Sequence, residues 1–349
     1  MQTQLIARDN AGNRSRDLFP QWNDDTANVA QENVVLPGND DAAGELLKER
    51  GASVAYGALR SLAEVDLSRA LRLTAQILAC SEPALRYAGV ALLARIDLPE
   101  TRDMARPLLD DPDLRVALAA FEALEPSEET SRPEDFERIE RLLWRMPEKP
   151  ETLTPLVWSW AFISTDRSRL ADSLTHCLGK LSAIRLTPYL AAMSATGRSA
   201  AVEAMRQGAV TDASLRLALV KLVGDSSPQV REKAVSAVKR RRLLDDEAPH
   251  LERLLGRKAN DLRRSVISLL LTQPDGAALN SARRLLESHD PQPRLAGLEM
   301  LSDMVKRDRA AGPCRTVAAA YHVRRGPVAG KEAWLVESLL IPAQAQASA

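Results

Sequence analysis

The sequence has 349 residues, of which 45% are hydrophobic and 27% are charged, a composition typical of folded proteins with a sizeable core. No apolar run approaches the roughly 20 residues that cross a bilayer, and the N-terminus lacks the apolar segment of a secretory signal. The cysteines Cys80, Cys177 and Cys314 form no C-x-x-C pair, which argues against a disulfide framework or a zinc knuckle. These features predict a soluble, cytoplasmic protein without membrane contact.

The formal net charge of zero hides an uneven distribution of charge along the chain. Residues 1–150 carry 18 basic and 27 acidic side chains, whereas residues 228–331 carry 21 basic and 12 acidic ones. We therefore expect one end of the molecule to be acidic and the other basic. Such asymmetry can indicate an anionic partner, and the alternative is that the arginines only solvate outer helix faces.

Both ends of the chain are predicted to lie outside the folded array. Residues 1–41 are rich in Asn, Asp and Gln and have no apolar period, so they are expected to be disordered or loosely docked. Within them, Phe19 and Trp22 either form a short docking segment or cap the first repeat. Residues 342–349 are predicted to be a frayed tail.

Helical periodicity is nearly continuous from residue 42 to residue 341, with a longer loop expected at 125–133. Helices are predicted at 42–63, 67–79, from Pro83, from Pro99, around Arg115, and at 134–145, 152–164, 166–178, 182–193, 197–207, 211–223, 228–242, 247–256, 259–271, 275–287, 290–308, 314–323 and 330–341. The segment 152–164 is apolar all round, which predicts a buried helix. Trp144, Trp158, Trp160 and Phe162 are accordingly predicted to form the thick middle of the core.

An arginine recurs along the chain at a nearly constant spacing. Arg231, Arg263 and Arg294 are 32 and 31 residues apart, and each is followed by apolar or small residues at +3, +4, +6 and +7. Arg86 and Arg115 repeat the arrangement 29 residues apart. A period near 30 built from two short helices is typical of a stacked array. The sequence predicts an all-α protein, a right-handed α-solenoid of about eight or nine helical hairpins, continuous over 42–341.

The helix starts in this array resemble the short HEAT repeat of the kind named after phycobilisome lyases. Asp111-Pro112-Asp113-Leu114-Arg115 and Ser227-Pro228-Gln229-Val230-Arg231 are the best copies. In such repeats an aspartate and an arginine usually pair between neighbouring units. The resemblance therefore implies structural roles for Arg86, Arg115, Arg231, Arg263 and Arg294.

Two further blocks, 149–158 and 251–275, resemble the helical region of large bacterial proteins of the MolR-like class. This resemblance implies that the chain is a piece or a shortened relative of a longer bacterial protein. It implies no catalytic residues.

The sequence contains no motif that indicates catalysis or a cofactor. Gly-rich phosphate-binding loops and the G-x-S-x-G motif are absent, and His176, His250, His289 and His322 have no metal-ligand spacing. We therefore predict no catalytic, cofactor or metal site and no small-molecule substrate. An enzyme or lyase built on the array is kept as a distant alternative.

A cluster of basic residues lies in the C-terminal half and consists of Lys239, Arg240, Arg241, Arg242, Arg257, Lys258, Arg264, Arg283 and Arg284. Cations at helix C-termini offset the helix dipole, which explains part of the cluster. The other interpretation is a positive stripe for an anionic partner. The main prediction is a non-enzymatic scaffold that binds a protein partner through its concave face, and the alternative is binding of a nucleic-acid backbone.

Overall fold

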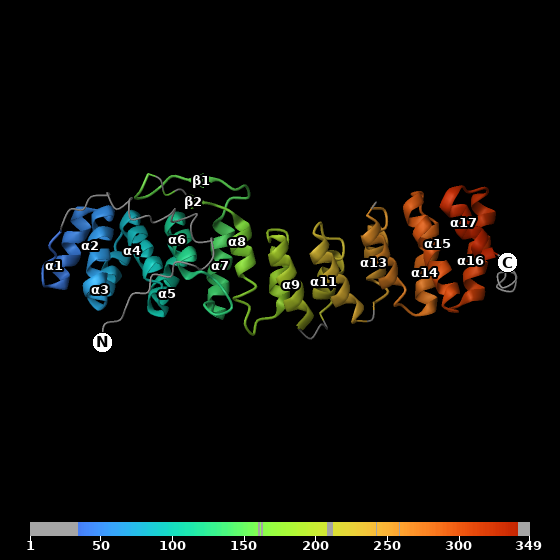
Figure 1. Cartoon of the computed structure of the whole chain (residues 1–349), viewed down its shortest axis with the longest axis horizontal. Helices are drawn as coiled ribbons and strands as arrows, with labels where there is room; N and C mark the ends of the chain where they lie inside the picture. Colours follow the sequence, from blue (N-terminus) through green and yellow to red (C-terminus); the bar gives the residue numbers. More distant parts are fainter. Residues whose placement is uncertain are drawn as a thin grey trace. The chain divides into compact units, whose positions relative to one another are not determined.

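The computed structural model describes residues 34–159, 161, 163–207, 212–241, 243–257 and 259–340. These residues form two compact units. Unit 1 extends to Leu181 and includes Ala191–Ser194, and unit 2 consists of Ser182–Leu190 and the chain from Ala195 onward. Within each unit, successive helices pack as pairs and the pairs stack on one another (Figure 1). The prediction of an all-α helical repeat protein is confirmed.

Unit 1 contains four helix pairs arranged in two layers. Layer A consists of α2 (Ala52–Val65), α4 (Pro83–Ile96), α6 (Leu114–Leu124) and α8 (Arg167–Ser173). Layer B consists of α1 (Asp40–Arg50), α3 (Leu67–Leu78), α5 (Pro99–Ala105) with the 3₁₀ helix η2 (Arg106–Asp110), and α7 (Pro133–Arg145). The core lies between these layers and is built mainly from leucine and alanine side chains.

Unit 2 contains five helix pairs with the same two layers. Layer A consists of α9 (Ala195–Gln207), α11 (Pro228–Lys239), α13 (Asn260–Leu270), α15 (Pro291–Lys306) and α17 (Gly330–Leu340). Layer B consists of the 3₁₀ helix η3 (Ala183–Tyr189), α10 (Ala213–Leu222), α12 (Ala248–Leu254), α14 (Asp275–Leu286) and α16 (Ala311–Arg325).

Helix starts in both units are specified by short local signals. Asp66, Asp113, Asp212 and Asp290 cap α3, α6, α10 and α15 by accepting a hydrogen bond from a backbone N–H in the first turn. Proline is the first residue of α4, α11 and α15, where its missing N–H would have no partner in the helix. These signals place the repeat arginine in the first turn of its helix.

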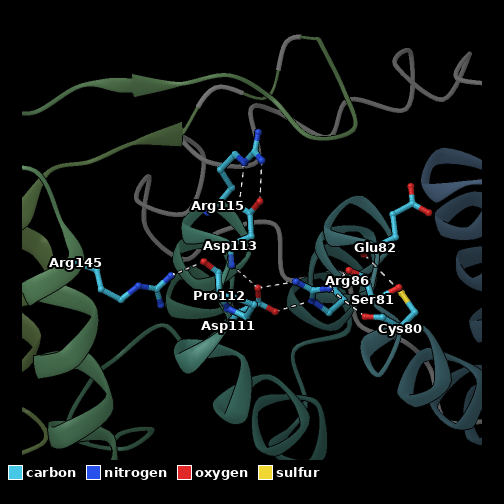
Figure 2. Close-up of polar contacts among 9 residues, drawn as sticks. All are labelled: Cys80, Ser81, Glu82, Arg86, Asp111, Pro112, Asp113, Arg115 and Arg145. Atoms are coloured by element: carbon cyan, nitrogen blue, oxygen red, sulfur yellow. Dashed lines mark hydrogen bonds and ion pairs between the residues drawn. The ribbon is translucent and has the colours of Figure 1, made fainter.

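An arginine at this position ties one layer A helix to the next, as Figure 2 shows for Arg86. Its guanidinium donates to the Asp111 carboxylate at 2.6 and 2.9 Å and to the carbonyls of Cys80 and Ser81 at 3.0 and 2.7 Å. Asp111 also accepts from the backbone N–H of Asp113, which holds the next loop in place. We call this arrangement the arginine clasp.

The clasp recurs in unit 2. Arg231 donates to the carbonyls of Asp225 and Ser226. It also donates to the carboxylate of Asp261, which lies in the first turn of α13. Arg294 donates to the carbonyls of Ser288 and His289 and to Glu332 of α17. In each copy the same side chain fixes its own loop and reaches the next pair, at Asp111 before α6, at Asp261 in α13 or at Glu332 in α17, so the clasp links consecutive pairs.

Three predicted helices differ from the structure. The predicted helix 42–63 is divided at Gly51, where φ is +83°, into α1 and α2. A glycine adopts this left-handed conformation without the penalty that a side chain would add. The predicted helix 182–193 is the shorter 3₁₀ helix η3, which contains Pro188. Proline cannot donate the backbone hydrogen bond of a regular helix.

The third difference is the predicted apolar helix 152–164, which is wrong. Thr152–Leu153 (β1) and Ile163–Ser164 (β2) pair as a small antiparallel sheet. Next to these strands, Thr165 forms hydrogen bonds with the backbone of Glu151 at 2.8 to 3.1 Å, which join the two ends of the hairpin. Thr, Val, Ile and Trp favour extended backbone, and Pro155 interrupts a helical ladder. We call residues 147–166 the strap.

The strap packs against the N-terminal halves of layer A helices in unit 1. Trp158, which is 5% exposed, meets Tyr56 of α2 edge-on at 5.1 Å between ring centroids and Tyr87 of α4 at 6.0 Å. The Thr154 carbonyl accepts from Arg115 of α6 at 3.3 Å. Figures 1 and 2 show the hairpin of the strap passing over the N-terminal end of α6, where Arg115 lies.

The predicted aromatic core is therefore only partly correct. Trp158 is buried, but Trp144 on α7 is 70% exposed, because layer B leaves one side of α7 open to solvent. The side chains of Trp160 and Phe162 lie outside the described residues, as do Phe19, Trp22 and the tail 342–349. Residues 125–132 connect α6 to α7 without a helix. The single array over 42–341 stays a prediction.

Candidate binding groove

An open groove of about 660 Å³ lies on layer A of unit 2. It is lined by Asn260, Arg263, Arg264, Ile267, Ser268 and Leu271 of α13 and its end, by Glu299, Asp303 and Arg307 of α15 and its end, and by Lys331 of α17. The α13 residues are spaced three and four apart, so they form one face of that helix. The groove therefore follows the direction of the layer A helices.

Ion pairs between neighbouring helices form one wall of the groove. Arg263 donates through Nε to Glu299 at 2.8 Å, and Lys331 donates to the same carboxylate at 2.6 Å. The Nη1 atom of Arg263 donates to the carbonyl and the side-chain oxygen of Gln292, both at 3.1 Å. These bonds connect α13, α15 and α17, so the wall is fixed before any ligand arrives.

One donor in this wall has no acceptor. The Nη2 atom of Arg263 is shut off from solvent and makes no hydrogen bond to the described residues. A buried donor without an acceptor costs free energy. After a small rearrangement of the Arg263 side chain, Nη2 could therefore donate a hydrogen bond to an acceptor on a ligand.

The remaining charged groups of the groove point to solvent. Arg264 and Arg307 are exposed, and Lys331 remains largely exposed beside Glu299. Arg263, Arg264, Arg307 and Lys331 face only two carboxylates, Glu299 and Asp303, so the groove carries a net positive charge. Ile267 and Leu271, which are 6% and 5% exposed, add a narrow apolar strip, and together these features suit a ligand with both carboxylate and apolar groups.

The groove includes one repeat position that contacts the strap in unit 1. Tyr56 is the fifth residue of α2, and Tyr87 is the fifth residue of α4. The fifth residues of α13, α15 and α17 are Arg264, Leu295 and Trp334, and of these three Arg264 lines the groove. Trp334 is 59% exposed and lies one helical turn from the groove residue Lys331.

Of the predicted anion-binding residues, only Arg264 lines the groove. Lys239 and Arg240 are exposed at the end of α11, and Arg283 and Arg284 lie on α14 in layer B. The side chains of Arg242 and Lys258 lie outside the described residues. The basic residues thus occur on both layers of unit 2, and their binding role stays a prediction.

Several members of that cluster already have protein partners. Arg284 donates twice to Glu252 of α12 at 2.6 and 3.0 Å, and this hydrogen bonding raises the pKa of Arg284 further. Arg241 donates to the carbonyls of Met205 and Arg206, and burial lowers its pKa. Arg257 donates to the carbonyl of Gly224. These side chains hold the array together and have fewer donors left for a ligand.

The repeat arginines are placed as follows. Arg86, Arg231 and Arg294 form clasps, and Arg263 pairs with Glu299 and lines the groove. Arg115 pairs with Asp113 at 2.7 Å, within its own helix start, and not with a neighbouring unit. This hydrogen bond lowers the pKa of Asp113.

The periodic arginine pattern did not reveal the other side chains of the groove. Glu299, Asp303 and Arg307 are spaced by four on α15, which was visible as an i, i+4 pattern. No sequence pattern indicated that Lys331 belongs to the groove, because only the stacking of α17 on α15 brings it to Glu299. Arg198 with Asp225, at 2.7 Å, is a further inter-helix pair outside the predicted set.

Among the described residues, no group of three His, Cys, Asp or Glu side chains is arranged to hold a metal ion. None of the helices in the described ranges combines the length and the apolar character of a bilayer crossing. Burial raises the pKa of the Cys177 thiol to about 11, so that buried sulfur is held in its neutral form.

Paired helices, two layers and clasps repeated along the chain define a helical repeat protein of the solenoid class. More particularly, the chain belongs to a family of unknown function (DUF5724), whose model matches residues 37–349. A comparison with curated proteins gave no match. The resemblance to MolR-like proteins stays a prediction.

Solved structures of low similarity include other helical proteins. A chain of a full-length AP-3 complex model in an intermediate open conformation is 15% identical, with a TM-score of 0.38 over 88% of this chain and 64% of that one. The CpcE–CpcF complex of phycocyanin lyase from Nostoc sp. PCC7120 is 16% identical, with a TM-score of 0.30 over 89% and 96%. Kap95p bound to RanGDP is 13% identical, with a TM-score of 0.33 over 88% and 47%. This chain thus spans less than two thirds of the AP-3 chain.

Proposed function

We propose that the protein is a non-enzymatic scaffold of the short HEAT-repeat kind that binds a protein partner through the groove on layer A of unit 2. The observation that carries the proposal is the groove itself, which combines exposed cations with the apolar residues Ile267 and Leu271. Interfaces of this kind combine an apolar centre with a polar rim. The wall of Arg263, Glu299 and Lys331 is tied together by ion pairs, so the surface is pre-organised for binding.

Nucleic-acid binding is the weaker alternative. A duplex is followed by cations that are free to contact successive phosphates, whereas Arg284 and Arg241 are engaged with protein acceptors. An enzyme or lyase built on the array stays the most distant alternative.

Site-specific photocrosslinking tests the proposed function. A photoreactive amino acid at Ser268, in the groove, is compared with one at Asn280, an exposed position on layer B. We expect a discrete crosslinked protein from a lysate of the source organism only with the probe at Ser268. The crosslink should be lost when Arg264→Glu and Arg307→Glu are introduced. Equal crosslinking from both positions, or none from Ser268, contradicts the proposal.

Nucleic acid is tested in the same experiment. Nuclease treatment of the lysate leaves the crosslink unchanged if a protein is the direct partner. A crosslink that disappears after nuclease treatment, together with binding of the purified chain to a DNA or RNA duplex at low salt, favours the alternative.

A further inference from the structure

The strap of unit 1 and the groove of unit 2 share one repeat position, because Tyr87 of α4 and Arg264 of α13 are both the fifth residue of their helix. The strap is a two-stranded hairpin whose connecting loop places Trp158 against Tyr56 and Tyr87, the fifth residues of two successive layer A helices. The chain thus contains one example of a non-helical segment that packs on its layer A surface. In unit 2 the groove offers Arg264 at this position, and Trp334, the fifth residue of α17, lies one helical turn from the groove residue Lys331.

We propose that the groove of unit 2 binds an extended segment of a protein partner in which carboxylate and apolar side chains alternate. This inference rests on the proposed function and specifies its ligand. The partner's segment would lie along the groove, in the direction of α13 and α15, with Lys331 of α17 beside it.

The charge of the groove selects carboxylates. Arg264 and Arg307 are exposed and form no ion pair with another side chain among the described residues, and Lys331 shares Glu299 with Arg263 while its side chain stays 61% exposed. An entering carboxylate therefore meets cations that are still available. Because Glu299 already pairs with Arg263 and Lys331, the attraction for an entering carboxylate is strongest at Arg264 and Arg307.

The apolar part of the groove is the reason that we expect apolar side chains to alternate with carboxylates in the bound segment. Successive side chains of an extended chain point to opposite sides. One side of the segment can therefore contact Ile267 and Leu271 while the other reaches the cations. Trp334 offers an aromatic surface on α17, as Tyr56 and Tyr87 do beneath the strap. Aromatic side chains of this kind frequently dominate binding energy at interfaces.

The unsatisfied Nη2 atom of Arg263 is a second, independent observation. The side chain is about nine-tenths buried, its other donors are used, and this atom has no acceptor among the described residues. A backbone carbonyl or a carboxylate of the bound segment is the type of acceptor that it lacks.

Fluorescence anisotropy with the full chain tests this inference. The probe is a fluorescein-labelled peptide of alternating glutamate and leucine, and the matched control peptide has lysine in place of glutamate. We expect the acidic peptide to bind and the basic peptide to bind at least ~10-fold more weakly. Binding of the acidic peptide should weaken as salt is raised, because the cations are exposed.

Matched variants locate the binding. The double variant R264E/R307E should weaken binding of the acidic peptide by ~10-fold or more, and Trp334→Ala by roughly 5-fold. The double variant R240E/R283E changes charge equally but lies outside the groove, so its affinity should stay within about 2-fold. Unchanged circular-dichroism melting curves exclude unfolding as the cause.

Three outcomes overturn the inference: equal binding of the two peptides, absence of binding by the acidic peptide, and equal loss in R240E/R283E. The photocrosslink from Ser268 separates this failure from failure of the proposed function. If the crosslink persists while the acidic peptide does not bind, the groove binds a protein of other chemistry. If both are absent, the groove is not a protein-binding site.

Discussion

The two units use the same repeat position in opposite ways. In unit 1 the fifth residues of α2 and α4 are tyrosines that are covered by Trp158 of the strap. In unit 2 the equivalent positions carry Arg264 and Trp334, which face solvent. The side chain at this position therefore distinguishes a layer A surface that the chain itself covers from one that is open to a partner. The layers beneath are the same.

The clasps differ from copy to copy in burial. The side chains of Arg86 and Asp111 are 9% and 2% exposed, whereas Asp261, the partner of Arg231, is 58% exposed. A buried pair that loses one member leaves an uncompensated charge, but an exposed pair leaves a solvated one. The same contact thus has a different energetic weight in these two copies, and the Arg294–Glu332 clasp of unit 2 is closer to the buried one.

The largest expected effect comes from breaking the buried clasp. Arg86→Ala leaves Asp111 charged and buried, and it removes two bonds to loop carbonyls, so we expect a loss of roughly 3–5 kcal/mol in unfolding free energy. Arg231→Ala should cost about 1 kcal/mol. Urea unfolding followed by hydrogen exchange within each unit measures both. Equal losses would contradict the comparison.

Removal of the strap's anchor comes next. Trp158→Ala deletes a buried indole between Tyr56 and Tyr87, with an expected cost of about 3 kcal/mol. Hydrogen exchange should increase in the N-terminal halves of α2 and α4 and remain unchanged in α13 and α15. Trp144→Ala, at an exposed site in the same unit, is the control and should cost under ~1 kcal/mol. Similar costs for both tryptophans would mean that the strap does not stabilise unit 1.

Alkaline pH should loosen the strap selectively. Burial raises the pKa of Tyr56 and of Tyr87 from 10.0 to about 12. Because the folded-state pKa is above the unfolded one, the stabilisation is complete below pH 10 and is lost as the pH rises toward 12. The expected loss is roughly 2 kcal/mol or less per tyrosine.

The double variant Y56F/Y87F provides the control for this pH effect. Its urea midpoint should fall less steeply between pH 10 and pH 11.5 than that of the unmodified chain, because neither phenyl ring ionises. Phenylalanine at 87 also removes a buried hydroxyl that has no acceptor in the described part of the chain. Identical pH slopes for the two proteins would rule out ionisation beneath the strap.

The smallest expected effect on stability is in the open groove. Arg264→Glu and Arg307→Glu replace exposed side chains, so the unfolding free energy should change by no more than about 0.5 kcal/mol for each. Thermal unfolding monitored by circular dichroism checks this. A loss of unfolding free energy above ~2 kcal/mol would mean that these arginines hold the helices together. The groove would then be a packing contact between helices and not a binding surface.

The architecture could be predicted from the sequence because it depends on local signals that recur. The arginine spacing and the proline and aspartate helix starts locate the stacked pairs through most of unit 2 and around Arg86. The strap could not be predicted in this way. Its apolar run is compatible with a buried helix as well as with a strand. The contacts that select the observed hairpin are made by Tyr56 and Tyr87, which lie about 100 and 70 residues earlier in the chain.

The groove was only partly predictable for a related reason. Charge counting indicated a basic half and included Arg264, but it also selected Arg284 and Arg241, which have acceptors inside the protein. Which cation stays available depends on the carboxylates and carbonyls that stacking brings to it. Lys331 and Glu299 illustrate this, since 32 residues separate them in the chain and 2.6 Å separates their charged atoms.

The exposed bond between Arg231 and Asp261 has a mechanical consequence. Each clasp is one of the polar links between consecutive pairs, and in a repeat array a load passes from one pair to the next in series. Water competes for the Asp261 carboxylate much more than for that of Asp111. When the chain is pulled by its ends, the junction of α11 with α13 should therefore yield before that of α4 with α6, which makes it the point of greatest compliance of the two.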